Sequence, residues 1–233
     1  MRTARRRPHV LLAFAGAIVL AGCAIGASTP TPRPACPTAA PAAEEATAIV
    51  EGSDWAVVVT NKGELTFELE PEGAPIGVAN FVALARCGFY DGLTFHRVIA
   101  AFVAQAGDPQ TRENHGDFDG LGSGSPGYRF EVEFPPEETT YERYMVAMAN
   151  AIQYDPATGE ITSPTDSNGS QFFVMLDDVP ALRPYYSLLG RVSGGTDVLD
   201  AIGQVPTTQS DVPLDPVVIE SLRIEGGPVE SPV

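Results

Sequence analysis

The sequence predicts a mainly β fold, namely a closed barrel plugged by short helices. Several segments alternate apolar with polar residues, which is the pattern of half-buried antiparallel strands. Two short segments carry apolar residues at helical spacing instead. The predicted strands and helices do not follow the regular βαβ order that a parallel sheet requires, so a barrel is the better interpretation.

The first strands are predicted at residues 55–59 and 65–69. Apolar and polar residues alternate cleanly in the second segment, and the Asn-Lys-Gly turn at 61–63 separates the two. Together they predict a β-hairpin.

A first helix is expected after Pro75, because apolar residues recur at helical spacing as far as Ala85. Gly88 is placed to end this helix in a left-handed conformation. A second helix is expected at residues 197–202. The remaining segments with strand character are residues 102–106, 128–134, 144–149, 171–176 and 217–224.

The N-terminus has the composition of an export signal. A cluster of arginines precedes an uncharged apolar run at residues 10–20, and small residues follow it. The run covers only about half of a ~30 Å hydrocarbon core, which disfavours a permanent transmembrane helix. We therefore expect residues 1–22 to be a signal peptide.

The residues before Cys23, Leu-Ala-Gly at 20–22, resemble a bacterial lipobox. This implies cleavage before Cys23 and attachment of lipid to its sulfur, so that the protein is extracytoplasmic and lipid-anchored to a bacterial membrane. An ordinary secreted protein with a chance cysteine is the alternative.

A stretch rich in Pro, Ala and Thr follows Cys23. Such a composition favours extended, semi-rigid conformations, so we expect residues 23–53 to be a tether. A proline-rich ligand for a partner is the weaker alternative. The globular domain is then expected at residues 54–226, with a flexible tail at 227–233.

The chain is acidic, with 30 Asp and Glu against 14 Lys and Arg and a formal net charge of −16. Nucleic acid is bound through basic groups, so this surface repels it. The charge excludes nucleic acid as a partner.

Two cysteines remain beside the lipidation site. In an oxidising compartment Cys36 and Cys87 could pair, but sequence does not supply the geometry that such a bond needs. A buried free thiol at Cys87 is the alternative, and both stay open.

One stretch places an arginine and an amide beside an apolar surface. If residues 102–106 form a strand, side chains alternate and Val103 shares a face with Gln105. A cation, an amide and an apolar patch suit a peptide ligand better than a phosphate.

This stretch, with Phe-His-Arg at 95–97, resembles the signature of the cyclophilin family of peptidyl-prolyl cis-trans isomerases. Residues 148–150 and 168–173 resemble the other half-site of that family, and the resemblance extends over about 55–225. It implies an eight-stranded antiparallel barrel capped by two helices. It also implies a monomeric isomerase of proline-containing polypeptides that uses no cofactor and no metal.

The resemblance also assigns roles to single residues. Arg97 is implied to be the catalytic donor, with Phe102 and Gln105 completing the catalytic set. The substrate-binding positions are implied to be Val103, Ala149, Asn150, Gln171, Phe173, Leu182 and Tyr186.

Some positions depart from the better-known animal members of the family. Val103 stands where methionine is common, and Ala181 and Tyr186 stand where an aromatic residue or histidine is frequent. A non-catalytic peptide-binding or assembly module of the same fold is therefore the alternative. A lipid-anchored solute receptor is disfavoured, because such receptors usually have two α/β lobes.

Two further features are interpreted as structural. His96 alternates away from Arg97 on a strand, and the isomerisation needs no proton transfer. The long loops at 109–127 and 151–167 carry acidic residues without the spacing of a metal-binding loop, so we expect solvated loops.

Overall fold

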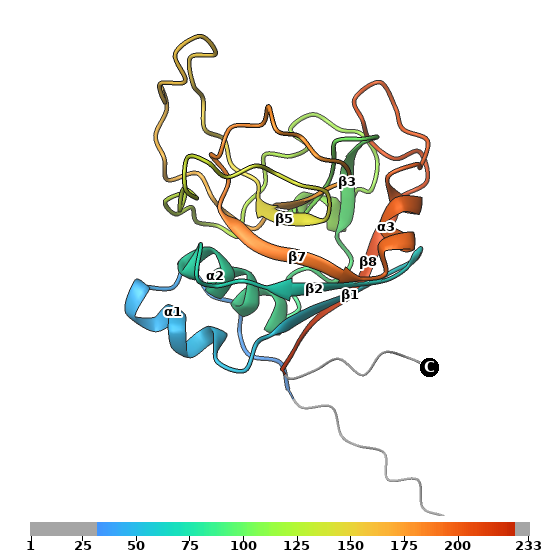
Figure 1. The fold of residues 1–233 in the computed structure, drawn as a ribbon. Coiled ribbons are helices and arrows are strands. Elements are labelled where there is room, and N and C mark those ends of the chain that lie inside the picture. Colours follow the sequence, from blue (N-terminus) through green and yellow to red (C-terminus); the bar gives the residue numbers. More distant parts are fainter. Residues whose placement is uncertain (1–31, 227–233) are drawn as a thin grey trace, which may run out of the picture. The chain divides into compact units, whose positions relative to one another are not determined.

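The alternating segments of the chain form eight strands, and every strand pairs with its neighbours in antiparallel register (Figure 1). The strands are β1 (Trp55–Thr60), β2 (Gly63–Leu69), β3 (Thr94–Ile99), β4 (Val103–Ala106), β5 (Met145–Met148), β6 (Phe172–Met175), β7 (Leu188–Gly194) and β8 (Val217–Glu225). They close into a barrel in the order β1-β2-β7-β5-β6-β4-β3-β8. The predicted eight-stranded antiparallel barrel is confirmed.

This computed structural model describes residues 32–226. The predicted signal peptide, the lipidation site at Cys23 and the C-terminal tail lie outside the described residues. Within the described part of the chain, no helix is long and apolar enough to cross a membrane.

Aromatic rings fill the barrel. Phe172 lies at the centre of the cluster, with its ring centroid 5.5–6.3 Å from those of Phe67, Phe81, Tyr90 and Phe95. All four contacts are edge-to-face, an arrangement worth about 0.5–1.5 kcal/mol per pair beyond the burial of apolar area. The packed interior makes the barrel a rigid support for its outer surface.

Strand β6 shows how the two faces of the barrel wall are used. Phe172 and Val174 belong to the interior core, whereas Phe173 and Met175 belong to a second apolar cluster on the outer side. This follows from the period of two along a strand. A strand buried on both faces therefore carries an apolar site on its outside.

Helix α2 (Pro75–Arg86) packs against the core through Val78, Phe81 and Val82. The N-cap residue before the helix, Ala74, offers no capping side chain. The carboxylate of Glu133 instead accepts hydrogen bonds from the free N–H groups of Ile76 and Gly77, at 3.0 and 2.7 Å. The helix ends before Gly88, whose φ of 78° is left-handed as expected.

The two expected helices are present, and the described residues contain a third α-helix in addition. Helices α2 and α3 (Thr196–Ile202) are the predicted ones, and a 3₁₀ turn lies at Pro109–Arg112. The additional helix α1 (Ala43–Val50) lies within the predicted tether. Its alanines and glutamates are strong helix formers, and it packs against α2, with Ala46 fully buried.

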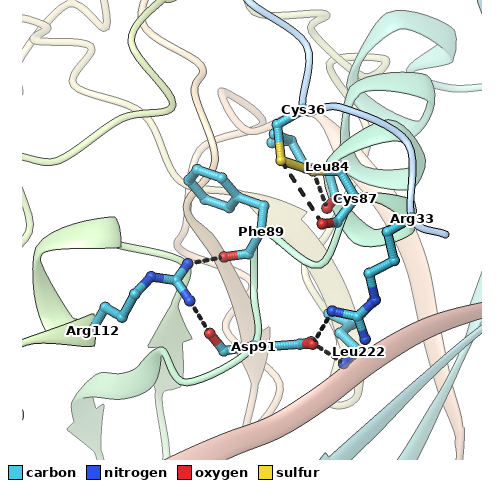
Figure 2. A network of polar contacts seen from close by, with 8 residues as sticks. All are labelled: Arg33, Cys36, Leu84, Cys87, Phe89, Asp91, Arg112 and Leu222. Carbon is cyan, nitrogen blue, oxygen red and sulfur yellow. Dashed lines mark hydrogen bonds and ion pairs between the residues drawn. A yellow bond between two sulfur atoms is a disulfide. The ribbon is translucent and has the colours of Figure 1, made fainter.

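Polar and covalent contacts hold residues 33–53, here called the N-terminal strap, on the domain. A disulfide joins Cys36 to Cys87 directly after α2, and Arg33 forms an ion pair with Asp91 (Figure 2). The other Asp91 carboxylate oxygen accepts from the backbone N–H of Leu222 in β8, at 3.0 Å. The strap is therefore part of the domain, and the open question of the two cysteines is resolved in favour of pairing.

The segment 128–134 is not the regular strand that its alternation predicted. Only Phe130 forms a bridge, with Asn168. The N–H of Val132 bonds to the carbonyl of Thr165 and that of Glu133 to the hydroxyl of Ser187. A loop carbonyl and a side-chain hydroxyl therefore satisfy these backbone groups. Phe130 and Val132 are buried as the alternation predicted, but Phe134 is exposed.

Candidate functional site

The β3–β4 hairpin positions the predicted catalytic arginine and glutamine. Arg97 and Gln105 are direct partners in the antiparallel register, so their side chains leave the barrel on the same face. An Arg97 guanidinium nitrogen, Nη1, lies 3.5 Å from Oε1 of Gln105, at the limit of a hydrogen bond. The guanidinium is thus guided by Gln105 and retains donors for a ligand.

A relay of amides fixes Gln105 in turn. Its Nε2 donates to Oε1 of Gln171, at 2.9 Å. The Nε2 of Gln171 donates to the backbone carbonyls of Gly122 and Gly124, both at 2.8 Å. The Arg97 side chain is thereby connected through two glutamines to the loop that follows the 3₁₀ turn.

That glycine-containing loop is itself anchored by a buried carboxylate. Asp108 accepts hydrogen bonds from the backbone N–H groups of Gln110, at 2.8 Å, and Gly122, at 2.7 Å. Gly124 lies so close to Asp108 that an added Cβ would be 2.1 Å from its Oδ1. A side chain at position 124 would therefore displace this loop.

The outer apolar cluster of the barrel lies beside the arginine. Val103, Phe173 and Met175 are buried in it, and Phe102, Leu182 and Tyr186 pack around them. The rings of Phe173 and Tyr186 meet edge-to-face, with centroids 5.2 Å apart. These side chains form an apolar wall at the surface of the domain.

Tyr186 is held in this wall by Tyr141. The Tyr141 hydroxyl donates to the carbonyl of Tyr186, at 2.8 Å, and accepts from its N–H, at 3.0 Å. Burial raises the pKa of Tyr141 well above its ordinary value, so it stays a protonated donor. No sequence pattern indicated this role of Tyr141, because the contact spans 45 residues.

The predicted site residues come together around two adjoining recesses. The first, of about 230 Å³, is lined by Arg97, Phe102, Val103, Gln105, Ala149, Asn150, Phe173, Leu182 and Tyr186. Gln171 lines the second, of about 300 Å³, which shares Gln105, Ala149 and Asn150 with the first. Residues from β3, β4 and β6, and from the segments that connect the strands, thus line one continuous groove.

Arg97 has one ion-pair partner that was not predicted from the sequence. Asp211 lies 3.8 Å from the Nε of Arg97, and its backbone carbonyl accepts from the N–H of Val98 in β3, at 2.8 Å. The two side chains are 40% and 41% exposed, so solvent screens the pair and it stabilises the fold little. The long loop before β8 therefore contributes charge at the rim of the groove.

His96 does not simply alternate away from Arg97 as expected, because the register of β3 shifts between Phe95 and Arg97, and His96 lines a recess together with Arg97 and Gln105. It is 3% exposed, and neither ring nitrogen has a hydrogen-bond partner among the described residues. Burial lowers the pKa of its imidazole, against the opposing influence of Asp108. The ring is therefore neutral at physiological pH.

The altered rim position Ala181 is exposed and does not line either recess. Val103 and Tyr186 both line the first recess and keep it apolar. Within residues 32–226 no group of His, Cys, Asp and Glu is arranged to hold a metal ion. The groove offers an apolar pocket with N–H donors at its edge, which suits a small apolar ring attached to a peptide backbone.

Comparisons with known proteins agree with this geometry. A family described as "Cyclophilin type peptidyl-prolyl cis-trans isomerase/CLD" matches residues 56–224. Peptidyl-prolyl cis-trans isomerase B of Streptomyces anulatus is 39% identical over 189 residues, which cover 73% of this chain and 96% of the relative. Peptidyl-prolyl cis-trans isomerase A of Mycobacterium tuberculosis is 38% identical over 186 residues, covering 72% and 91%.

Solved structures give the same result. A cyclophilin-type isomerase of Cryptosporidium parvum superposes with a TM-score of 0.62 at 30% identity, covering 75% of this chain and 99% of its own. A second crystal structure of that isomerase was determined in the presence of the dipeptide Ala-Pro, again with a TM-score of 0.62.

Barrel, groove and relatives define an enzyme class, the peptidyl-prolyl cis-trans isomerases. The chain belongs to the cyclophilin-type family of these isomerases.

Proposed function

We propose that the chain accelerates rotation about X-Pro bonds in exported polypeptides and that Arg97 does so by stabilising the twisted amide. The observation that carries this proposal is the position of Arg97 at the edge of an apolar recess walled by Phe102 and Phe173. The Ala-Pro dipeptide used with the Cryptosporidium parvum relative supports a prolyl residue as the occupant.

The chemistry requires a donor and an apolar pocket, and no proton has to move. Resonance makes the amide planar and gives its rotation a barrier of about 20 kcal/mol. When the bond twists, the prolyl nitrogen regains a lone pair and the charge separation of the amide falls. A donor aimed at that nitrogen inside an apolar recess binds the twisted state more tightly than either planar state.

The other groove residues hold the polypeptide for this step. The apolar wall takes the prolyl ring, and the amide of Gln105 offers a hydrogen bond to the substrate backbone. Asn150 donates its own amide to the carbonyl of Tyr185, at 2.7 Å, which fixes the groove wall on the opposite side. All these groups come from one chain, which supports action as a monomer.

An exchange measurement tests the proposal. Cis–trans exchange of an Ala-Pro tetrapeptide is followed by NMR without a coupled protease, with the wild type and with Arg97→Ala. A charge-assisted hydrogen bond contributes roughly 1.5–3 kcal/mol, so the variant should be about ten- to a hundredfold slower. An undiminished rate in Arg97→Ala would remove Arg97 from the mechanism.

We also infer that the mature protein is anchored by lipid on Cys23 outside the cytoplasm. The basic, apolar and small-residue order of the first 23 residues supports export. The Cys36–Cys87 disulfide supports an oxidising compartment. Polypeptides crossing the same membrane would then be the clients.

Replacing Cys23 tests the anchor. In bacteria that process lipoproteins, the wild type should partition into the detergent phase of a two-phase extraction, because two or more acyl chains anchor a protein stably. Cys23→Ser should partition into the aqueous phase, with Cys36→Ser as the control that keeps the anchor. Equal partition of wild type and Cys23→Ser would show that no lipid is attached there.

A further inference from the structure

Exposed aromatic side chains gather next to the prolyl groove. Among the described residues, the exposed large hydrophobic side chains are Phe134 at 43%, Tyr154 at 38% and Leu214 at 62%. Phe134 and Tyr154 both meet the ring of Tyr185 edge-to-face, with centroids 6.0 and 5.2 Å away. We call these three rings, Phe134, Tyr154 and Tyr185, the aromatic shelf. Single exposed apolar residues are ordinary, but a contiguous group marks a surface for interaction.

The shelf is built on an ordered arm and not on a loose loop. Residues 152–163 fold back as a short hairpin, with a bridge between Tyr154 and Ile161 and a hydrogen bond of 2.8 Å from the N–H of Thr162 to the carbonyl of Gln153. Figure 1 shows this arm, in gold, projecting from the barrel.

Two further contacts fix the arm to the segment that carries Tyr185. The Tyr185 hydroxyl donates to the carbonyl of Gly159, at 2.6 Å. The guanidinium carbon of Arg183 lies 5.5 Å from the ring centroid of Tyr154. The rings are therefore held in place before any ligand arrives, which lowers the entropic cost of binding one.

The shelf is continuous with the groove. Tyr185 precedes Tyr186, a wall residue of the first recess, so their Cα atoms are about 3.8 Å apart. Asn150 lines both recesses and donates to the carbonyl of Tyr185, at 2.7 Å. An extended polypeptide advances about 3.3 Å per residue, so a chain with its proline in the recess reaches the shelf within a few residues.

We propose that the aromatic shelf is a second docking surface for the client polypeptide. It binds apolar and aromatic side chains that lie several residues away from the isomerised proline. Such side chains are exposed in long unfolded polypeptides and absent from the short peptides that fill only the recess. The shelf therefore makes the enzyme selective for unfolded chains, an inference that rests on the isomerase function proposed above.

The chemistry of the shelf favours a polypeptide over a membrane as its occupant. The rings offer edges and faces to prolyl and aromatic side chains, while Asp155 and Glu160 on the same arm are exposed. The whole chain carries a formal net charge of −16, which repels anionic lipid head groups. An unfolded segment with apolar or basic side chains is not repelled by this negative charge.

Kinetics with two substrates distinguish the contribution of the shelf from that of the catalytic centre. The first is the Ala-Pro tetrapeptide. The second is a small protein whose refolding waits for one prolyl isomerisation, which presents a long unfolded chain. Tyr154→Ala should raise KM for the refolding protein about three- to tenfold, the value of one lost aromatic contact, and leave its kcat unchanged. With the tetrapeptide the variant should equal the wild type.

Matched variants distinguish recognition from folding. Tyr154→Phe keeps the ring and should restore the wild-type KM for the refolding protein. Leu214→Ala removes the most exposed large hydrophobic side chain of the described residues, which lies in the loop before β8 and not on the arm. This variant should leave the kinetics with both substrates unchanged. Phe134→Ala should act in the same direction as Tyr154→Ala.

The possible failures have different signatures. If Tyr154→Ala leaves KM for the refolding protein unchanged, or changes both substrates equally, the shelf is not a docking surface. Binding of the wild type, but not of Tyr154→Ala, to neutral lipid vesicles would assign the shelf to a membrane instead and overturn the proposal. If the wild type accelerates neither substrate, the proposed isomerase function itself is wrong.

Discussion

The position of a single guanidinium depends on neutral amides more than on its charged neighbour. Asp211 is the only acidic side chain that forms an ion pair with Arg97 in the described part of the chain, and both partners are solvent-exposed. The relay from Gln105 through Gln171 to the carbonyls of Gly122 and Gly124 is shorter and more buried. Amide partners orient Arg97 without neutralising it, so its charge remains available to the twisted bond.

Removing the relay should therefore slow the reaction. Gln171→Leu removes three hydrogen bonds, one with Gln105 and two with the loop carbonyls of Gly122 and Gly124. The bond with Gln105 is the one that bears on Arg97, and its loss, about 0.5–1.5 kcal/mol, predicts a three- to tenfold lower kcat/KM for the tetrapeptide. Gln105→Leu and the double variant complete a double-mutant cycle. Both residues act through the same hydrogen-bond relay. The fold-decrease in kcat/KM of the double variant should therefore be smaller than the product of the two single fold-decreases. Fully multiplicative losses would contradict the relay.

The buried His96 predicts how stability depends on pH. Burial lowers the pKa of its imidazole below the usual 6.5, so the folded protein holds the neutral ring while the unfolded chain protonates below about pH 6.5. The unfolded state then binds more protons, and the free energy of unfolding falls as the pH drops through that range, by up to about 1.4 kcal/mol per pH unit. The neighbouring charges are Asp108, which opposes this effect, and Arg97, which adds to it.

Denaturant unfolding of wild type and His96→Asn at about pH 7.5 and pH 5 checks this expectation. The wild type should lose more stability on acidification than the variant, which has no imidazole to protonate. The same loss in both proteins would assign the acid sensitivity to other groups.

At the level of elements, the sequence predicted what depends on local pattern. The hairpin of β1 and β2, helix α2 with its end at Gly88, and helix α3 all follow from periodicity and turn chemistry. The segment 128–134 buries Phe130 and Val132 as predicted but exposes Phe134, and it forms no strand ladder because a loop and Ser187 take its backbone hydrogen bonds. Helix α1 was missed because the prolines before it dominate the composition, and its burial against α2 is a tertiary contact.

The N-terminal strap carries a prediction of its own. The Cys36–Cys87 disulfide closes a separation of 51 residues, and a native disulfide in a domain of this kind contributes typically 2–4 kcal/mol. The double variant Cys36→Ser and Cys87→Ser should lose about that much unfolding free energy. Its kcat/KM for the tetrapeptide should stay within about twofold of wild type, because the disulfide follows α2 and lines neither recess.

A reductant supplies the control for this experiment. It should lower the unfolding free energy of the wild type toward that of the double variant and leave the double variant unchanged. Equal stability of wild type and double variant would mean that α1 and the Arg33–Asp91 pair hold the strap without the disulfide.

On the scale of the whole molecule, a closed barrel lets an enzyme present its site on a wall instead of in its interior. On β6, Phe172 and Val174 point into the barrel core, and Phe173 on the outer face lines the groove. Arg97, Gln105 and Phe173 leave the same outer face because they are register partners across the adjacent strands β3, β4 and β6. The rigid packing of the barrel core thus fixes the positions of the groove residues on its outer surface.

The site could be predicted from the sequence only as far as its motifs reach. The two motif segments supplied most of the residues that line the first recess, together with Gln171 in the second, whereas Leu182 and Tyr186 lie outside those segments. Asp211, Tyr141 and the aromatic shelf lie on segments without a motif, and only the fold brings them to the groove. Their contribution depends on contacts between residues far apart in the chain, which periodicity does not report.

The central claim is that Arg97 acts on the twisted bond and not on the resting substrate. Measuring both the exchange rate of a saturating Ala-Pro tetrapeptide and its Kd by NMR, for wild type, Arg97→Lys and Arg97→Ala, tests it most directly. The account predicts an exchange rate about ten- to a hundredfold lower in Arg97→Ala, partial activity in Arg97→Lys, and a Kd within about threefold of wild type in both. A Kd that weakens as much as the rate falls would show that Arg97 merely binds the substrate, and would contradict the claim.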